Sequence, residues 1–407
     1  MRAARCAAVI ALAGSLAAGI ASAGGPLALR SNGQAYVWNT ASAIQYRTDD
    51  GPLSGSVSET AARARVQAMF AVWQDVASAN IRYNRTGFID NAPGFSDGDV
   101  STAGEFDAIE GDCNNGNQSP IVYDATGEIF DAVIGDDAVI GFAGPCAVDP
   151  GTGHIIAGHA VMNGLYQDGQ PNPIQDLTAA EFDATFIHEF GHFSGLDHSQ
   201  INVACANIFC SADDLAGLPT MFPFLVSDQQ GSLSIDDVAW ISKLYPQGGG
   251  TGFAATHGTI RGRVYFSDGE SQLQYANVVA RRLDAGGAEN RRFAVSVVSG
   301  YRFRACRPNP VTNPPASDCA PAGSEAPDDI GLYEIPVPAG TYTVEVESID
   351  PQFTAGSSVG PSDFPIALPG SAPAPLGPIT VAAGAASSGH DIVIPGTPPR
   401  FDQFEGP

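Results

Sequence analysis

The chain has 407 residues and a mass of 42.0 kDa, a length typical of two domains that each bury their own core. Its 44 acidic and 19 basic residues give a net charge of -25, which argues against nucleic acids and anionic membranes as partners, because both would be repelled. A hydrophobic content of 44%, with 47 glycines and 30 prolines, indicates a loop-rich globular protein and excludes a coiled coil or a collagen-like rod.

Residues 1–23 have the pattern of a signal peptide. Arg2 and Arg5 precede an apolar stretch at 7–18, and residues 21–23 form a small-x-small cleavage site. The apolar stretch is shorter than the roughly 20 residues that a transmembrane helix needs. We therefore expect a secreted protein without a transmembrane anchor, cleaved near Ala23, with the periplasm as an alternative destination.

Of the seven cysteines, Cys6 lies in the signal segment and six remain. An even number of cysteines in an exported chain indicates disulfides, and the Cys-x-x-Cys spacing of a zinc-thiolate site does not occur. Six cysteines allow fifteen pairings. Nearest-neighbour pairing keeps each bridge within one domain, and it predicts Cys113–Cys146, Cys205–Cys210 and Cys306–Cys319.

A glycine-rich segment at 247–256 is typical of a linker and separates domains at 24–246 and 257–396; a loose tail follows at 397–407. Helical and strand patterns mix before the linker, whereas period-two alternation predominates after it. The predicted fold class is therefore α+β: a twisted mixed sheet with long helices, followed by an antiparallel β-sandwich of about seven short strands.

In chain order, we expect a strand pair at 35–38 and 44–46, a helix at 58–79, a strand at 81–83, an irregular loop at 96–118, and strands at 138–143 and 155–162. Capping boxes, Thr178 with Glu181 and Ser234 with Asp237, predict the starts of two further helices. In the second domain, residues 338–341 are expected to form a hairpin turn.

The segment from His188 to His198 carries the chemistry. His188 and His192 are four residues apart on the expected helix, so both imidazoles project from one face and can bind one ion. On a continuous helix, His198 would lie about 15 Å along the axis from His188, so the chain must turn back. Gly195 stands where that turn is needed, because glycine adopts the left-handed conformation at little cost.

Three histidine ligands on Zn²⁺ leave one position open for water, which is typical of a catalytic site. Glu189 follows the first histidine and is expected to act as the general base, and then as the general acid, while a zinc-activated water attacks the peptide bond.

The eleven-residue pattern, with Ser199 after the third histidine, resembles that of the metzincin zinc peptidases and most of all their matrixin branch. Segments 72–76 and 234–245 resemble the first and last long helices of that family, and the resemblance covers residues 34–246. It implies one catalytic zinc ion per chain. It also implies a Met-turn at 219–223, in which Met221 forms an apolar floor beneath the metal.

The resemblance further implies that a protein or peptide substrate pairs with an edge strand above the cleft. The residues expected to bind substrate are Ile140, Gly141, Phe142, Ala143, Phe222 and Phe224. An ordinary central strand is the alternative for 140–143. The segment 222–227 would form the wall of an apolar pocket.

Three departures from the matrixin pattern stand out. An inhibitory pro-segment with a zinc-binding cysteine is missing between Ala23 and the first strand, and Pro223 replaces the tyrosine that astacins use as an extra ligand. A second, structural zinc site is not expected, because only His154 and His159 are spare.

A calcium site at Asp124 and Asp131 is an alternative to the favoured interpretation of an acidic surface loop.

The second domain resembles carboxypeptidase-regulatory-like (transthyretin-like) modules, on the patterns at 262–266, 331–335 and 338–344. It either docks to the substrate or to a cell surface, or presents ordinary solvated strands.

We expect a monomeric, exported zinc endopeptidase. The alternatives are an adhesion or binding protein with a vestigial zinc domain, and a zinc hydrolase that acts on a non-peptide substrate.

Overall fold

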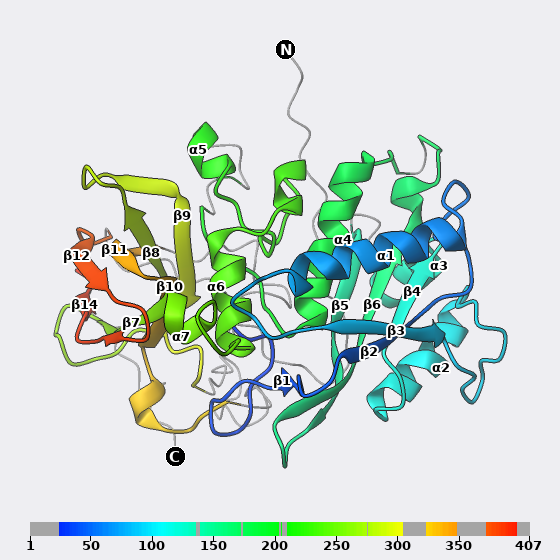
Figure 1. Cartoon of the computed structure of the whole chain (residues 1–407), viewed down its shortest axis with the longest axis horizontal. Helices are drawn as coiled ribbons and strands as arrows, with labels where there is room; N and C mark the ends of the chain where they lie inside the picture. Colours follow the sequence, from blue (N-terminus) through cyan, green and yellow to red (C-terminus); the bar gives the residue numbers. More distant parts are fainter. Residues whose placement is uncertain are drawn as a thin grey trace, which may run out of the picture.

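The computed structural model describes residues 24–135, 139–171, 174–202, 205, 210–274, 276–303, 323–347 and 372–396. The first part of the chain forms a six-stranded sheet in the order β1-β6-β4-β2-β3, with β5 also paired to β6 (Figure 1). Its strands are β1 (Val37–Trp38), β2 (Ile44–Thr48), β3 (Tyr83–Phe88), β4 (Pro120–Asp124), β5 (Gly141–Asp149) and β6 (His154–Asn163). All pairs are parallel except β5–β6, which is antiparallel.

Helices cover both faces of this sheet. They are α1 (Glu59–Gln74) and α4 (Ala179–Phe193) on one face, and α2 (Ala103–Asn114) and α3 (Glu128–Val133) on the other. Strand β4 shows the division, because Ile121 and Tyr123 belong to the core beneath α1 and α4, while Val122 packs with α2 and α3. Phe70 of α1 stacks on Phe190 of α4 with the ring centroids 3.7 Å apart.

Two expectations for this part are wrong. The loop expected at 96–118 contains α2, whose start is fixed by a capping box of Thr102 and Glu105 and whose buried face includes Phe106 and Ile109. The expected pairing of 35–38 with 44–46 does not form, because β1 pairs with β6 and β2 with β3 and β4. The shorter elements of the described chain are η1 (Gly164–Gln167), α5 (Ala212–Leu215), η3 (Asp228–Gly231), α6 (Ile235–Leu244), α7 (Phe253–Thr256) and η4 (Pro327–Asp329).

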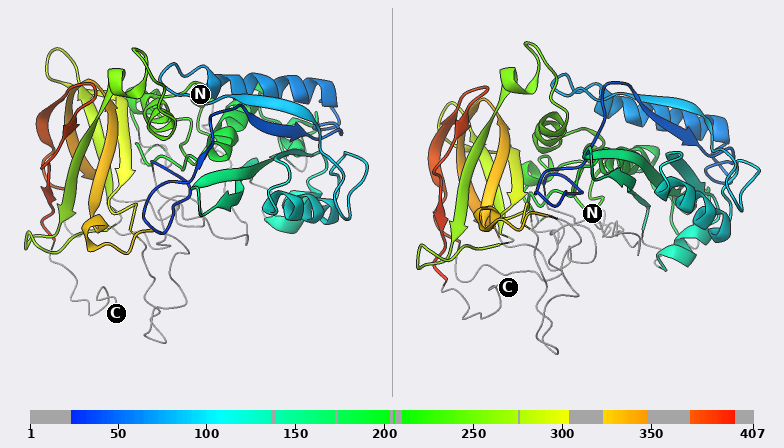
Figure 2. Two further views of the ribbon diagram at one scale, coloured as in Figure 1. Left: turned by 60° about the horizontal axis from the view of Figure 1, so that its bottom comes forward. Right: turned by 90° about the horizontal axis from the view of Figure 1, so that it is seen from below.

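The second part contains two four-stranded sheets, β10-β7-β13 with β14 on β7, and β12-β11-β8-β9. Their strands are β7 (His257–Tyr265), β8 (Asn277–Leu283), β9 (Glu289–Val298), β10 (Leu332–Pro338), β11 (Gly340–Glu347), β12 (Leu376–Val381), β13 (Ala386–Ser387) and β14 (Ile392–Val393). Figure 2 shows these strands at the opposite end of the molecule from α2. The mixture of a helix-covered, largely parallel sheet and antiparallel sheets agrees with the predicted α+β class in general.

Two details of the sandwich differ from expectation. Residues 338–341 do not close a hairpin, because β10 pairs with β7 whereas β11 pairs with β8 and β12, so the chain passes from one sheet to the other at this point. The sandwich is also not wholly antiparallel, since β13 and β14 lie parallel to β7.

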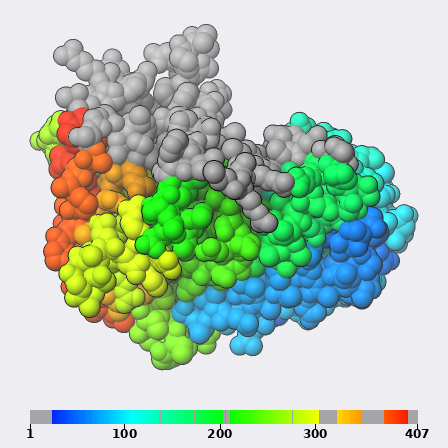
Figure 3. Space-filling model, turned by 90° about the horizontal axis from the view of Figure 1, so that it is seen from above, coloured from blue at the N-terminus to red at the C-terminus, as the bar shows by residue number. Residues whose placement is uncertain are grey.

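The two parts pack closely together. Helix α6 contacts β9 and β10, and one cluster of buried apolar residues extends from the first sheet through Trp240 into the sandwich. In Figure 3 the green residues of the first part lie directly against the yellow strands of the second.

Both disulfides that fall within the described residues are confirmed: Cys113–Cys146 joins α2 to β5, and Cys205–Cys210 closes a short loop. The expected Cys306–Cys319 pair lies outside the described residues. Among the described helices, none has both the length and the apolar character that a membrane-spanning segment needs.

Candidate metal centre

Helix α4 supplies the first two histidines. It begins after Thr178, whose hydroxyl accepts the amide of Glu181 while the Glu181 carboxylate accepts the amide of Thr178, the capping box expected from the sequence. His188 and His192 lie one turn apart on the same face, and both are buried. Nearly every residue in the second half of this helix is buried, and most of them are apolar.

Gly195 turns the chain back toward the helix, as predicted. Its φ is +88°, and the amides of Gly195 and Leu196 donate to the carbonyls of His192 and Gly191 at 2.8 and 2.9 Å. These bonds close the last helical turn. The chain segment that follows then brings His198 beside the other two histidines.

The three imidazoles converge on one point. The Nε2 atom of His188 lies 3.1 Å from Nε2 of His192 and 3.1 Å from Nε2 of His198, and the remaining separation is 3.0 Å. Nitrogen ligands at roughly 2.0–2.1 Å from a tetrahedral zinc ion lie about 3.3 Å from one another. The observed triangle is close to that size, so this donor set fits Zn²⁺.

Backbone carbonyls fix the orientation of two of the rings. Nδ1 of His188 donates to the carbonyl of Thr220 at 2.7 Å, and Nδ1 of His192 donates to that of Leu196 at 2.8 Å. Because a carbonyl only accepts, the proton lies on Nδ1 and the Nε2 lone pair faces the centre. Burial lowers the pKa of His188 to about 4 and that of His192 well below its usual value, which favours the neutral rings that bind metal.

Glu189 lies beside His188 and is fully buried. Neither of its carboxylate oxygens has a hydrogen-bond partner among the described residues, and burial raises its pKa well above the usual value. Because buried polar groups are nearly always paired, a carboxyl group without a partner, on the residue that follows His188, indicates a site that takes up a polar or ionic ligand.

Met221 packs against the same helix. A Cβ atom on Gly191 would lie 2.2 Å from its Sδ, so only glycine at this position lets the methionine approach α4 this closely. Asp237 of α6 accepts the amide of Met221 at 3.0 Å and fixes this turn. Sequence reasoning singled out Met221 but missed that Gly191 makes room for it. The only sequence signal for Gly191 was its position between the histidines of the motif.

The segment Ile140–Ala143 lies at an open edge of the sheet, because β5 pairs only with β6 among the described strands. The amide of Asn163 donates to the carbonyl of Ile140 at 2.9 Å, so the backbone polar groups of Ile140 and Phe142 face β6. Those of Gly141 and Ala143 therefore face the open edge. This arrangement favours the expected edge strand over the central-strand alternative.

A narrow gap lies beside His188, and it has no room for a water-sized molecule. Its lining consists of Ala184, Thr185, His188, Thr220, Phe222, Leu225 and Gln230. Phe222 lines this gap and Phe224 does not, and both pack with Cys205 and Leu218 in a neighbouring apolar cluster. Sequence reasoning missed Gln230, whose Oε1 accepts the amide of Val226 at 2.7 Å and shapes this wall.

The structure does not bring the candidate calcium ligands together into a metal-binding group. The carboxylate of buried Asp124 accepts the amide of Phe130 at 2.9 Å and caps the start of α3. Asp131 is exposed on that helix. Neither residue belongs to a group of three or more metal-capable side chains within the described chain, and Asp136 and Asp137 lie outside the described residues.

His159 lies close to Cys113 and Cys146 in a second group of metal-capable side chains. The two sulfur atoms are bonded to each other, and Nδ1 of His159 lies 2.6 Å from a carboxylate oxygen of Glu110. We therefore interpret this group as structural.

Comparison of the chain with protein-family models and with curated proteins found no match. Its function is therefore inferred from the geometry and chemistry of the site alone.

Proposed function

We propose that this protein is an exported zinc endopeptidase of the metzincin type, with a matrixin-like catalytic domain at 24–246 and a carboxypeptidase-regulatory-like sandwich at 257–396. The observation that carries the proposal is the approach of three buried ring nitrogens to within 3.0–3.1 Å of one another. The residue after the first of these histidines, Glu189, has a buried carboxyl group without a partner among the described residues. The two disulfides are compatible with export.

His188, His192 and His198 would hold the zinc ion through Nε2. A bound zinc ion supplies Lewis acidity, which makes water more acidic and polarises a carbonyl group. The carbonyls of Thr220 and Leu196 keep two of the rings in the orientation and tautomer that ligation needs. Met221 closes the site from below with an apolar surface.

Glu189 would accept a proton from the attacking water and return it to the departing amine. Its burial suits both steps, because bulk water is kept away from the carboxyl group and cannot compete as a proton source. Since it follows His188 directly, the same turn of α4 places the base and a metal ligand side by side.

An extended peptide would bind antiparallel to β5. Gly141 and Ala143 offer backbone groups to it, and Pro145, the next residue in this alternation, lacks an amide on the open edge. Phe222 and Leu225 line the narrow gap beside His188, which would have to widen to receive an apolar side chain of the substrate. A free strand edge recognises main-chain amides, which favours a peptide over a non-peptide substrate.

The experiment that tests this proposal is hydrolysis of casein by the full-length protein, with and without a zinc chelator. The wild type should cleave casein and lose activity with the chelator. Glu189→Gln should keep its zinc and its fold but lose about 10²–10⁴-fold in rate. Glu181→Gln on the same helix keeps its capping function and should match the wild type.

The ligand assignment is tested by elemental analysis. His192→Ala should contain no zinc, whereas His154→Ala, whose ring contacts the carbonyl of Val37 instead, should retain one zinc per chain. Chelator-resistant cleavage by the wild type, or wild-type activity in Glu189→Gln, would overturn the proposed mechanism.

A further inference from the structure

Strand β9 of the sandwich contacts the metal-site domain through buried polar groups. The amide of Ser296 donates to the carboxylate of Asp236 at 2.8 Å, and its carbonyl accepts the indole N–H of Trp240 at 2.9 Å. Asp236 and Trp240 belong to α6, and all three residues are buried. The outer edge of β9 is thus satisfied at this point by a helix of the first domain.

The same serine reaches the segment that carries the third histidine. Its Oγ lies 3.3 Å from Oγ of Ser199, the residue after His198. The amide of Ser199 donates to the carbonyl of Met221 at 2.7 Å, and Asp237, next to Asp236, accepts the amide of Met221. Buried hydrogen bonds therefore join the sandwich to Ser199, the residue after His198, and Ser199 in turn to Met221.

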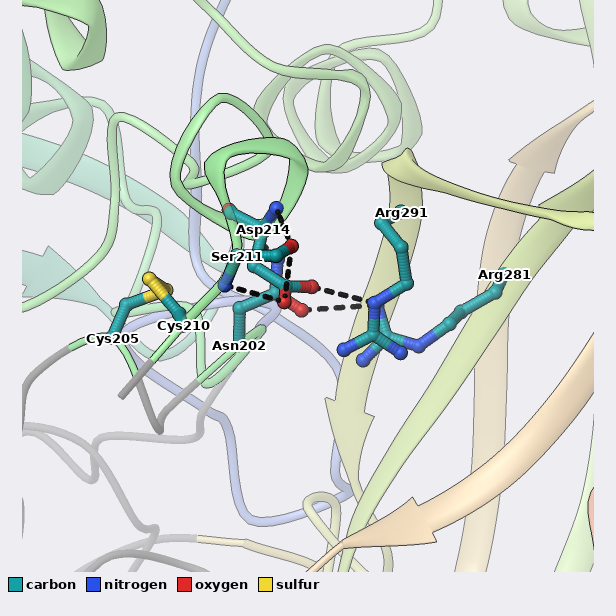
Figure 4. The surroundings of a disulfide bond; sticks show 7 residues. All are labelled: Asn202, Cys205, Cys210, Ser211, Asp214, Arg281 and Arg291. Carbon is teal, nitrogen blue, oxygen red and sulfur yellow. Dashed lines mark hydrogen bonds and ion pairs between the residues drawn. A yellow bond between two sulfur atoms is a disulfide. The ribbon is translucent and has the colours of Figure 1, made fainter. Parts of the chain in front are cut away.

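A second contact with the sandwich holds the loop that follows Ser199. The side chain of Arg281 on β8 is 0% exposed, and its Nη1 donates to Oδ1 of Asn202 at 3.1 Å. The guanidinium also pairs with Glu345 and Glu347 of β11. Figure 4 shows Arg281 and Arg291 extending from neighbouring strands toward Asn202 and Asp214.

Asn202 has an unusual backbone conformation that this contact supports. Its φ is +57°, the only positive value at a non-glycine residue of the described chain. Its Nδ2 donates to the carbonyl of Asp214 at 3.0 Å, while Asp214 pairs with Arg291 at 2.5 Å. The loop from His198 to Met221 is thus held from the sandwich at several points.

We propose that the sandwich is a positioning part of the metal centre, in which Ser296 and Arg281 hold the loop after His198 so that this histidine stays in ligand position. The inference rests on the proposed zinc site. Its physical basis is that ordering a long loop costs conformational entropy, and that groups around metal ligands typically change metal affinity about 10–100-fold. Arg281 and Ser296 are positioning residues and do not touch the metal.

The test is the rate at which the full-length protein transfers its zinc to a chromogenic chelator. Asn202→Gly is the informative variant, because glycine adopts a φ of +57° without strain while the acceptor for Arg281 is lost. We expect it to release zinc about ten-fold faster than the wild type. Asn202→Asp also loses the amide donor to the Asp214 carbonyl but retains an oxygen for Arg281, so it isolates the Arg281 contact and should release zinc within about two-fold of the wild-type rate.

A matched control comes from the same interface. Arg292 pairs with Asp213, but both side chains are more than half exposed. Arg292→Gln should therefore leave zinc release unchanged. If Asn202→Gly does not fold, Arg281→Lys gives the same information, because it keeps the charge facing Glu345 and Glu347 but lacks the guanidinium fork; it should also release zinc about ten-fold faster.

Unfolding by urea, measured on each variant, separates positioning from overall stability. Zinc release at the wild-type rate from a destabilised Asn202→Gly would overturn the inference, as would equally fast release from Asn202→Asp. Both outcomes would leave the zinc peptidase proposal standing. A wild-type protein that binds no zinc would instead overturn the proposed function, and this inference with it.

Discussion

Gly141 of strand β5 lies against the side chain of Glu189 with no room for another carbon atom. A Cβ on Gly141 would be 2.8 Å from Cγ and 3.0 Å from Oε1 of Glu189. Glu189 is fully buried on α4 and cannot swing into solvent. The edge strand therefore determines where the proposed catalytic base lies.

Gly141→Ala should lower kcat about 100-fold, because the methyl group displaces the Glu189 carboxyl from its position next to His188. Zinc content should not change, since the three atoms nearest to the new methyl group all belong to Glu189. The measurement is kcat and KM on a peptide substrate, together with elemental analysis.

Gly144→Ala on the same strand is the control. Its Cβ would make only an ordinary contact of 3.5 Å, with Leu27, so activity should match the wild type. Equal kcat values for the two variants would show that the approach of Gly141 does not position Glu189.

Gly195→Ala should weaken both the fold and the metal site. An alanine at a φ of +88° costs roughly 1–2 kcal/mol, and its Cβ would approach Ile155 to 3.3 Å. Because this turn places His198, we expect the free energy of unfolding to fall by at least about 1 kcal/mol and zinc affinity to fall as well. Urea denaturation and competition with a chelator measure the two effects.

Gly249→Ala separates backbone strain from the metal site. Gly249 also has a left-handed conformation, with φ +80°, but no atom lies within 4 Å of the added Cβ. It should show a comparable loss of stability with unchanged zinc affinity. A similar loss of zinc affinity in both variants would contradict the role of Gly195.

The helix starts were predictable from the sequence because capping is local. Thr178 and Ser234 each act as the N-cap that their patterns indicate. Helix α2 was missed because glycine and aspartate dominate the segment 96–118, although Thr102 and Glu105 carried a capping signal. The partners of β1 and β2 were not predictable, because β1 pairs with a strand more than 100 residues away.

The convergence of His188, His192 and His198 was predictable because their spacing on one helix and one turn determines where the three rings lie. The approach of Gly141 to Glu189 was not, since it depends on how β5 lies across α4. The contact between Arg281 and Asn202 joins residues 79 apart in the sequence, and only the packing of the two domains brings them together.

The two confirmed disulfides should contribute unequally to stability. The closed loops differ in length, with sequence separations of 33 for Cys113–Cys146 and 5 for Cys205–Cys210. Loop-closure entropy predicts that replacing both cysteines by serine lowers the free energy of unfolding by about 4 kcal/mol for the first pair and about 2 kcal/mol for the second. Urea denaturation without reductant measures this difference, and equal losses would contradict the entropic explanation.

Gly191 and Met221 should be energetically coupled. A Cβ on Gly191 would lie 2.2 Å from Sδ of Met221 and 2.9 Å from the indole of Trp73, so Gly191→Ala should cost about 1–3 kcal/mol through overpacking. Met221→Ala removes the nearer obstacle, so the double variant should be more stable than the sum of the two losses predicts, by at least about 0.5 kcal/mol.

The control for this cycle is Gly111→Ala in α2, where no atom lies within 4 Å of the added Cβ. In an open helical position alanine is favoured over glycine, so this change should stabilise the protein by about 0.5–1 kcal/mol. Strict additivity of Gly191→Ala and Met221→Ala would mean that the glycine in the motif is not there to admit the methionine. The close packing of residues 219–223 against α4 would then need another explanation. The second close neighbour of the added Cβ is Trp73, and it cannot supply that explanation because it lies outside this segment.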